Sequence, residues 1–142
     1  MQKLVSILML CVALLITEQV GWTAECGGAA MHISINGSAF AVTLEENATA
    51  REFAAMLPLT LHMDDLHSNE KYHNLKVLLP SAPKPVESVH AGDIMLFGDN
   101  CIVIFYKSFS TPYRYTRIGR MDNADELERV CGSGSITVSF SR

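Results

Sequence analysis

The sequence predicts an all-β domain, either a sandwich or a closed barrel, built from about seven or eight short strands with two short helices. Apolar and polar residues alternate with a period of two in several short segments, which is typical of half-buried strands. Glycine, asparagine and aspartate separate many of these segments and indicate hairpin turns. The chain of 142 residues is long enough for one well-filled core but too short for a two-domain enzyme.

The first thirty residues differ in composition from the rest of the chain. A polar start with one positive charge, Lys3, precedes thirteen mostly apolar residues from Leu4 to Ile16, and a polar stretch follows. This layout is typical of a secretory signal, and the apolar run is shorter than the roughly 20 residues that a transmembrane helix needs. We therefore expect residues 1–30 to be a signal peptide or an N-terminal hydrophobic segment, with cleavage near residues 28–30.

Cleavage there would leave a domain of residues 31–142 that is exported, either to the periplasm or as a secreted protein, without a stable membrane anchor. A permanent anchor and a translation start at Met31 are the alternatives. Of the four cysteines, only Cys101 and Cys131 would remain in this domain. We favour two separate buried thiols, and one disulfide in an oxidising compartment is the alternative.

The first element of the domain is a β-hairpin. Residues 32–35 and 39–44 alternate between apolar and polar side chains and flank Asn36-Gly37, a pair that accepts positive φ at both central positions of a type I′ turn. A helix is expected next, because a possible capping box begins at Thr49 and apolar residues then recur on one helical face. Pro58 would end this helix.

Two further strands are expected in the middle of the chain. Residues 59–63 alternate as a half-buried strand, and the polar residues 64–74 that follow read as a loop. Residues 76–79 form a second short apolar run that a proline closes. Residues 81–85 contain two prolines and are therefore expected to be extended and irregular, outside any central strand ladder.

The second half of the domain is predicted to begin with another hairpin. Residues 94–97 and 101–106 are apolar runs without clean alternation, so we expect both to lie inside the fold, joined by a turn that contains glycine. Residues 113–121 alternate again, residues 123–130 are compatible with a short helix, and residues 135–140 form the last strand.

Several short stretches, spread in order over most of the domain, carry a family resemblance. They are Leu57-Pro58-Leu59-Thr60, Asn69-Glu70-Lys71-Tyr72, Ala91-Gly92-Asp93-Ile94, Ile104-Phe105-Tyr106 and Thr116-Arg117-Ile118-Gly119. In these stretches the sequence resembles the bacterial cyclophilin-like family of small proteins. The resemblance implies that residues 31–142 form a closed eight-stranded β-barrel, the cyclophilin-like fold, with two short helices covering its ends. It implies no settled activity and no catalytic residues.

Proline isomerisation is the activity that the family name suggests. True cyclophilins use a Phe-His-Arg cluster, an aromatic floor and a tryptophan, but this sequence has no Phe-His-Arg, and its one tryptophan, Trp22, lies in the N-terminal segment. A single well-placed arginine such as Arg117 could still polarise a prolyl amide nitrogen. Whether the protein is an enzyme therefore stays open at this stage.

The strongest candidate for a ligand-binding surface is the strand at residues 113–121. Tyr113, Tyr115 and Arg117 share one face of that strand, because alternate residues point to the same side. Aromatic rings and a guanidinium group together could hold a peptide segment, a planar ring or an anionic group. The structural alternative is a solvated barrel wall whose tyrosines cover apolar neighbours.

A polar, histidine-rich segment at residues 62–73 is the second candidate. His62, Asp64 and His67 could ligate a divalent metal, but their spacing fits no known motif, so the sequence indicates neither a metal nor another cofactor. The favoured interpretation of this segment is structural, with Glu70 and Lys71 as a structural pair that closes the loop and Tyr72 packed on the barrel.

The net charge of −4 argues against nucleic acid as a partner, because no broad basic surface is available for phosphates. The sequence also lacks the nucleophile elbow of a hydrolase. The leading functional hypothesis is an exported, noncatalytic cyclophilin-like module that binds a small molecule or a peptide segment. The alternative from another class is a peptidyl-prolyl cis-trans isomerase with a degenerate active site.

Overall fold

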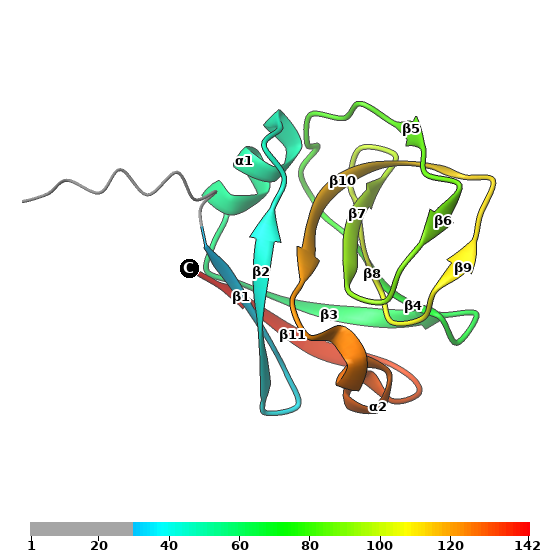
Figure 1. Cartoon of the computed structure of the whole chain (residues 1–142). Helices are drawn as coiled ribbons and strands as arrows, with labels where there is room; N and C mark the ends of the chain where they lie inside the picture. Colours follow the sequence, from blue (N-terminus) through cyan, green and yellow to red (C-terminus); the bar gives the residue numbers. More distant parts are fainter. Residues whose placement is uncertain (1–29) are drawn as a thin grey trace, which may run out of the picture.

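Strands from the beginning and the end of the described residues take part in one antiparallel barrel (Figure 1). The computed structural model describes residues 30–142, so the predicted signal segment, apart from its last residue, lies outside the described part. The elements in chain order are β1 (Met31–Ile35), β2 (Ser38–Leu44), α1 (Ala48–Ala55), β3 (Leu59–Leu66), β4 (Glu70–Asn74), β5 (Lys84–Pro85), β6 (Ser88–Val89), β7 (Asp93–Phe97), β8 (Cys101–Phe105), β9 (Phe109–Ser110), β10 (Arg114–Met121), η1 (Ala124–Glu126), α2 (Leu127–Cys131) and β11 (Ile136–Ser141).

The order of strands around the barrel is β2-β1-β11-β3-β4-β8-β7-β10, and β10 pairs back onto β2. This confirms the predicted fold class, a closed eight-stranded barrel with two short helices. Closure depends on Gly119, which lies opposite Leu44 across the β10–β2 seam. A Cβ atom at Gly119 would stand 2.7 Å from the backbone oxygen of Thr43, so the two strands meet at a distance that only glycine allows.

The barrel interior is filled by the apolar residues of the alternating strands. Met31, Ile33 and Ile35 on β1 are fully buried, whereas His32 and Ser34 between them are exposed. The β1–β2 hairpin is confirmed as predicted, with positive φ at both residues of its turn. Helix α1 packs onto the same interior, where the ring of Phe53 meets Phe140 of β11 edge to face with centroids 5.3 Å apart.

A second, smaller hydrophobic cluster lies on the outer side of the barrel. It comprises Val89, Met95, Val103, Phe105 and Tyr115. Three of the strands that contribute to it, β7, β8 and β10, belong to the barrel wall, and the short β6–β9 pair covers them from outside (Figure 1). One side of the barrel wall is therefore apolar on both of its faces, which explains why the β7 and β8 segments lack alternation in the sequence.

The predicted loop at residues 64–74 is wrong. Strand β3 continues to Leu66 and pairs with β4, and the turn between them has positive φ at His67 and Ser68. The strand predicted at residues 76–79 is also wrong. The backbone N–H groups of Leu75 and Leu79 donate to carbonyls of the β7–β8 turn at 2.8 and 2.7 Å, so the segment follows that turn instead of entering a ladder.

The ends of both predicted helices also differ from the structure. Helix α1 is capped by Asn47, whose Oδ1 accepts from the Ala50 backbone N–H at 2.8 Å, and not by Thr49. The second helical segment is a short 3₁₀ turn, η1, that continues into α2. Residues 81–85 are extended as expected, and β5 at their end pairs only with the edge of β10.

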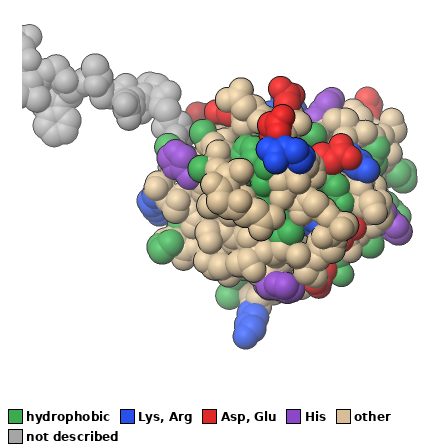
Figure 2. Space-filling view, turned by 90° about the horizontal axis from the view of Figure 1, so that it is seen from below, with side chains coloured by type: hydrophobic (Ala, Val, Ile, Leu, Met, Phe, Trp, Pro, Cys, Tyr) green, Lys and Arg blue, Asp and Glu red, His purple; other side chains and the backbone are tan. Residues whose placement is uncertain are grey.

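Both cysteines of the domain are free thiols, and Cys131 is buried. None of the helices within residues 30–142 is sufficiently long and apolar to cross a membrane. On the face seen in Figure 2, acidic and basic side chains are interspersed with hydrophobic ones.

Candidate ligand-binding site

Four neighbouring barrel strands, β4, β8, β7 and β10, form the wall on which the candidate site is built. The antiparallel register sets Tyr72 opposite Val103, and Cys101 opposite Phe97. Side chains alternate along each strand, so these outward residues lie on the face opposite to the buried Ile102 and Ile104 of β8. The outer face of the wall is therefore rich in aromatic side chains.

A cavity of about 590 Å³ opens on this outer face. Such a volume lies within the range of small-molecule sites. Its lining comes from β4, β8, β10 and the turns and segments next to them, and consists of Leu66, His67, Asn69, Glu70, Tyr72, Asn74, Phe97, Gly98, Asn100, Cys101, Val103, Phe109, Thr111, Tyr113 and Tyr115. We call it the aromatic cavity.

The rings of this cavity form a continuous series. Phe97 lies between Tyr113 and Tyr115, with ring centroids 6.0 and 5.7 Å away. Phe105 beneath the cavity meets Tyr115 at 5.4 Å and Phe109 at 5.7 Å, both edge to face. These separations are those of favourable aromatic pairs, so each ring holds its neighbours in a fixed orientation.

The rim of the aromatic cavity consists of large apolar side chains that are exposed to solvent. Tyr115 at the base is 5% exposed, whereas Tyr113 is 60%, Phe97 46% and Leu66 38% exposed. Among the described residues the other exposed large hydrophobic side chains are Val77 and Leu78, which are elsewhere. Clustered apolar exposure around a cavity is typical of a site that buries a partner.

Glu70 is the carboxylate of the aromatic cavity. Burial raises its pKa above the ordinary value, and the nearby His67 partly offsets this rise. Burial also raises the pKa of the Cys101 thiol and of the Tyr115 hydroxyl, and the negative charge of Glu70 adds to both effects. The cavity therefore keeps its thiol and phenol in their neutral forms at physiological pH.

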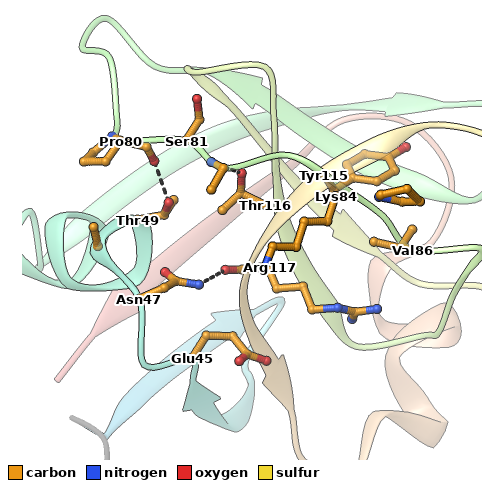
Figure 3. A pocket seen from close by; sticks show the side chains of 13 residues that line it. Glu45, Asn47, Thr49, Pro80, Ser81, Lys84, Val86, Tyr115, Thr116 and Arg117 are labelled. Carbon is orange, nitrogen blue, oxygen red and sulfur yellow. Dashed lines mark hydrogen bonds between the residues drawn. The ribbon is translucent and has the colours of Figure 1, made fainter.

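Arg117 lines a second, smaller cavity of about 330 Å³, which Tyr115 also lines (Figure 3). The Nδ2 atom of Asn47 donates to the Arg117 backbone oxygen at 2.8 Å, which ties the start of α1 to β10. The Thr49 hydroxyl donates to the Pro80 carbonyl at 2.5 Å. The second bond holds the segment after Pro80 against α1, and both bonds join residues that line this cavity.

The guanidinium group of Arg117 is directed to Asp93. Its Nη1 atom is 3.8 Å from Asp93 Oδ2, and Arg120 Nε donates to Asp93 Oδ1 at 3.1 Å. Asp93 is almost completely buried, and its Oδ2 also accepts from the His90 backbone N–H. Arg117 is thus part of an ion-pair network at the edge of a third, open cavity of about 750 Å³.

The histidine-rich segment does not form a metal site. Within residues 30–142, no group of three or more His, Cys, Asp or Glu side chains is arranged to hold a metal ion. His62 Nε2 and Asp64 Oδ1 are 3.8 Å apart on β3, whereas His67 lies in the following turn at the aromatic cavity. Glu70 and Lys71 do not form the expected structural pair, because adjacent residues of β4 point to opposite faces and Lys71 pairs with Asp65.

Lys71 instead points into the barrel end, where it is fully buried. Its Nζ atom donates to Asp65 Oδ1 at 2.8 Å and to the backbone oxygens of Gly132 and Gly134 at 2.9 and 2.6 Å. The Tyr106 hydroxyl donates to the same Asp65 oxygen at 2.5 Å. Lys71 therefore fastens the loop before β11 to the β3–β4 hairpin.

Comparison with known proteins agrees with this architecture. The family model of the cyclophilin-like family matches residues 33–141, which is most of the chain. The chain belongs to the cyclophilin-like family. No curated protein matches the chain significantly.

A solved structure of McbB in complex with tryptophan is similar to this cyclophilin-like domain, with a TM-score of 0.57 and 15% sequence identity. The similarity covers 79% of this chain and 44% of that chain, so the domain spans less than half the length of the McbB chain. At this identity the likeness is one of fold.

Within the cyclophilin-like barrel, the three predicted site residues do not all meet. Tyr113 and Tyr115 line the aromatic cavity together, Tyr115 and Arg117 line the second cavity together, and Arg117 also lines the third. Sequence reasoning missed Phe97 and Glu70 as cavity residues. Phe97 could have been found from its place directly before the predicted β7–β8 turn, but Glu70 could not, because its segment was interpreted as a loop.

Proposed function

We propose that this cyclophilin-like domain is an exported, noncatalytic module that binds a small molecule or a peptide segment in the aromatic cavity. Tyr113 and Tyr115 would contact the ligand directly, and Arg117 would contact a part of it that extends into the adjoining cavity. The observation that carries the proposal is the exposed apolar rim formed by Leu66, Phe97 and Tyr113. Covering such side chains removes apolar surface from water, which stabilises a complex by about 25 cal/mol per Å².

The chemistry of the cavity supports binding more than catalysis. The Cys101 thiol has a raised pKa and is therefore a poor nucleophile at neutral pH. Among the described residues, the hydrogen bonds at the cavity include none between a nucleophilic side chain and a general base. The tryptophan held in the McbB complex is consistent with a small-molecule partner for a barrel of this fold.

The aromatic cavity can be tested with the neutral fluorescent dye 1-N-phenylnaphthylamine. We expect the dye to bind the wild-type protein, and Tyr113→Ala to weaken binding about fivefold, because one aromatic contact contributes about 1 kcal/mol. Leu78→Ala is the matched control, because Leu78 is an exposed apolar residue that does not line the cavity. Equal dye affinity in wild type and Tyr113→Ala, or equal weakening by Leu78→Ala, would contradict the proposed site.

Isomerase activity is the competing function, and it is tested with a proline-containing peptide substrate. Arg117 is 40% exposed but is held 3.8 Å from Asp93, which leaves it less free to polarise a prolyl nitrogen. We expect no acceleration of cis-trans isomerisation. Acceleration that disappears in Arg117→Ala would instead establish a degenerate isomerase.

Export is tested by the intact mass of the protein recovered from its native host. The apolar N-terminal segment of the sequence supports removal of about the first thirty residues. We expect the mass of a chain that begins between residues 29 and 31. A full-length mass would overturn export through a cleaved signal.

A further inference from the structure

The aromatic cavity combines ring faces with a single carboxylate. Among the described residues that line it, Glu70 is the one carboxylate. His67 is the one side chain that can carry a positive charge, because the lining contains neither lysine nor arginine. The two neighbouring cavities differ, because each contains Arg117. The aromatic cavity is therefore electrically distinct from the rest of this side of the molecule.

Among the described residues, neither a lysine nor an arginine pairs with the Glu70 carboxylate, and His67 is the one group of opposite sign near it. Two other acids of the domain are each paired with a cation: Asp65 meets Lys71 at 2.8 Å, and Asp93 meets Arg120 at 3.1 Å. Within residues 30–142, no ion pair or hydrogen bond engages the Glu70 side chain, although it is only partly exposed and stands among aromatic rings. A charge in such surroundings is costly unless an opposite charge joins it.

The rings favour the same sign of ligand charge as Glu70 does. The face of an aromatic ring is negative, so a cation within about 6 Å of its centre is attracted, and rings around a cavity recognise substituted ammonium groups. Phe97, Tyr113 and Tyr115 line the cavity next to one another, so a cationic ligand there has three rings within reach. An anion would meet the Glu70 carboxylate without a lysine or arginine in the lining to offset the repulsion.

We propose that the ligand of the aromatic cavity is an organic ammonium ion that carries an apolar or aromatic group. Its cationic end pairs with Glu70, and its apolar part packs on Phe97, Tyr113 and Tyr115. This inference rests on the proposed function, because it names the ligand class of the same cavity. The ammonium group belongs either to a free amine or to a modified lysine side chain of a peptide.

The test compares two ligands of the same shape. Benzyltrimethylammonium carries a permanent charge, and 2,2-dimethyl-1-phenylpropane is its neutral isostere. Displacement of 1-N-phenylnaphthylamine at pH 8, where ordinary histidine side chains are neutral and carboxylates are ionised, gives the affinity of each. We expect the cation to bind about tenfold more tightly than the isostere. Acetyl-trimethyllysine amide is assayed in parallel. Tighter binding of this compound than of benzyltrimethylammonium indicates a peptide as the source of the ammonium group, and weaker binding indicates a free amine.

Glu70→Gln removes the charge and keeps the size of the side chain. We expect it to weaken the cation about tenfold and to leave the isostere unchanged. Glu52→Gln makes the same chemical change on the exposed face of α1 and is expected to change neither affinity. Because burial disfavours the Glu70 charge, Glu70→Gln is also expected to melt at or above the wild-type temperature.

Equal affinities of the cation and the isostere for the wild-type protein would overturn the ammonium inference without any variant. The proposed function would survive that result if Tyr113→Ala still weakened dye binding. Failure of both ligands to displace the dye would likewise overturn the ammonium inference. Dye binding that is insensitive to Tyr113→Ala would overturn the proposal that the aromatic cavity is the binding site. The failure of the ammonium inference and the failure of the proposed function are therefore distinguishable.

Discussion

The buried ammonium group of Lys71 offers the sharpest test of how this barrel is held together. Lys71→Met keeps most of the side-chain volume but removes all three hydrogen bonds from Nζ. The carbonyl oxygens of Gly132 and Gly134 lose their donor, and Asp65 loses its cation. The Tyr106 ring also loses the ammonium group that lies 5.0 Å from its centroid.

The expected loss of stability follows from the polar groups that lose their partner when the ammonium group is removed. A buried acceptor without a partner costs about 1 to 3 kcal/mol, and removal of one partner from a buried ion pair costs about 3 to 5 kcal/mol. The Asp65 side chain is 19% exposed, and the glycine loop lies at the surface, so water replaces part of what is lost. We therefore expect Lys71→Met to lower the free energy of unfolding by about 3 kcal/mol.

Urea unfolding followed by far-ultraviolet circular dichroism measures this change, provided that the m-value is unchanged. Lys76→Met is the matched control on an exposed lysine, and it should change the free energy of unfolding by less than about 0.5 kcal/mol. If Lys71→Met costs less than about 1 kcal/mol, the hydrogen bonds of the ammonium group merely offset its desolvation, and the reasoning is refuted.

Two further predictions concern acid stability and the barrel seam. Burial alone would raise the pKa of Asp65, but hydrogen bonds from Lys71, Tyr106 and the Ser68 backbone outweigh it and hold this pKa below its ordinary value. The stabilisation that Asp65 gives is therefore complete above about pH 4 and is lost as the pH falls further, so the stability difference between wild type and Asp65→Asn should shrink there. A difference that stays constant from pH 7 to strongly acidic pH would contradict this account. Gly119→Ala should lower the free energy of unfolding by about 1 to 3 kcal/mol, because its Cβ would stand 2.7 Å from the Thr43 backbone oxygen and overlap it. An unchanged thermal midpoint of Gly119→Ala would disprove this steric argument.

Local signals predicted the elements whose causes are local. The β1–β2 hairpin follows from Asn36-Gly37, because these residues adopt positive φ at low cost. The β3–β4 hairpin was missed, because the two turn residues with positive φ, His67 and Ser68, include neither glycine nor asparagine, the residues that signal such a turn in a sequence. Its second strand also hides a fully buried lysine, so the segment looks like a solvated loop in the sequence.

The candidate site divides in the same way. Alternation along one strand placed Tyr113 and Tyr115 on a common face, and the structure has both in the aromatic cavity. The same rule grouped Arg117 with them, but its guanidinium is drawn to the buried Asp93 of β7 and lines other cavities. Alternation gives the side of a strand on which a residue lies, but not the neighbour that attracts its charged end.

The sequence by itself determined the all-β class, most strand positions and the aromatic face of β10, because period-two patterns and turn residues act over a few neighbouring positions. Local patterns left sandwich and barrel open, and the family resemblance implied the barrel; the tertiary structure shows its closure, which depends on the pairing of β10 with β2, far apart in the chain. It also decided which side chains surround the cavity. Glu70, Phe97 and Tyr115 meet there only because β4, β8, β7 and β10 align in one register, and no local pattern encodes that alignment.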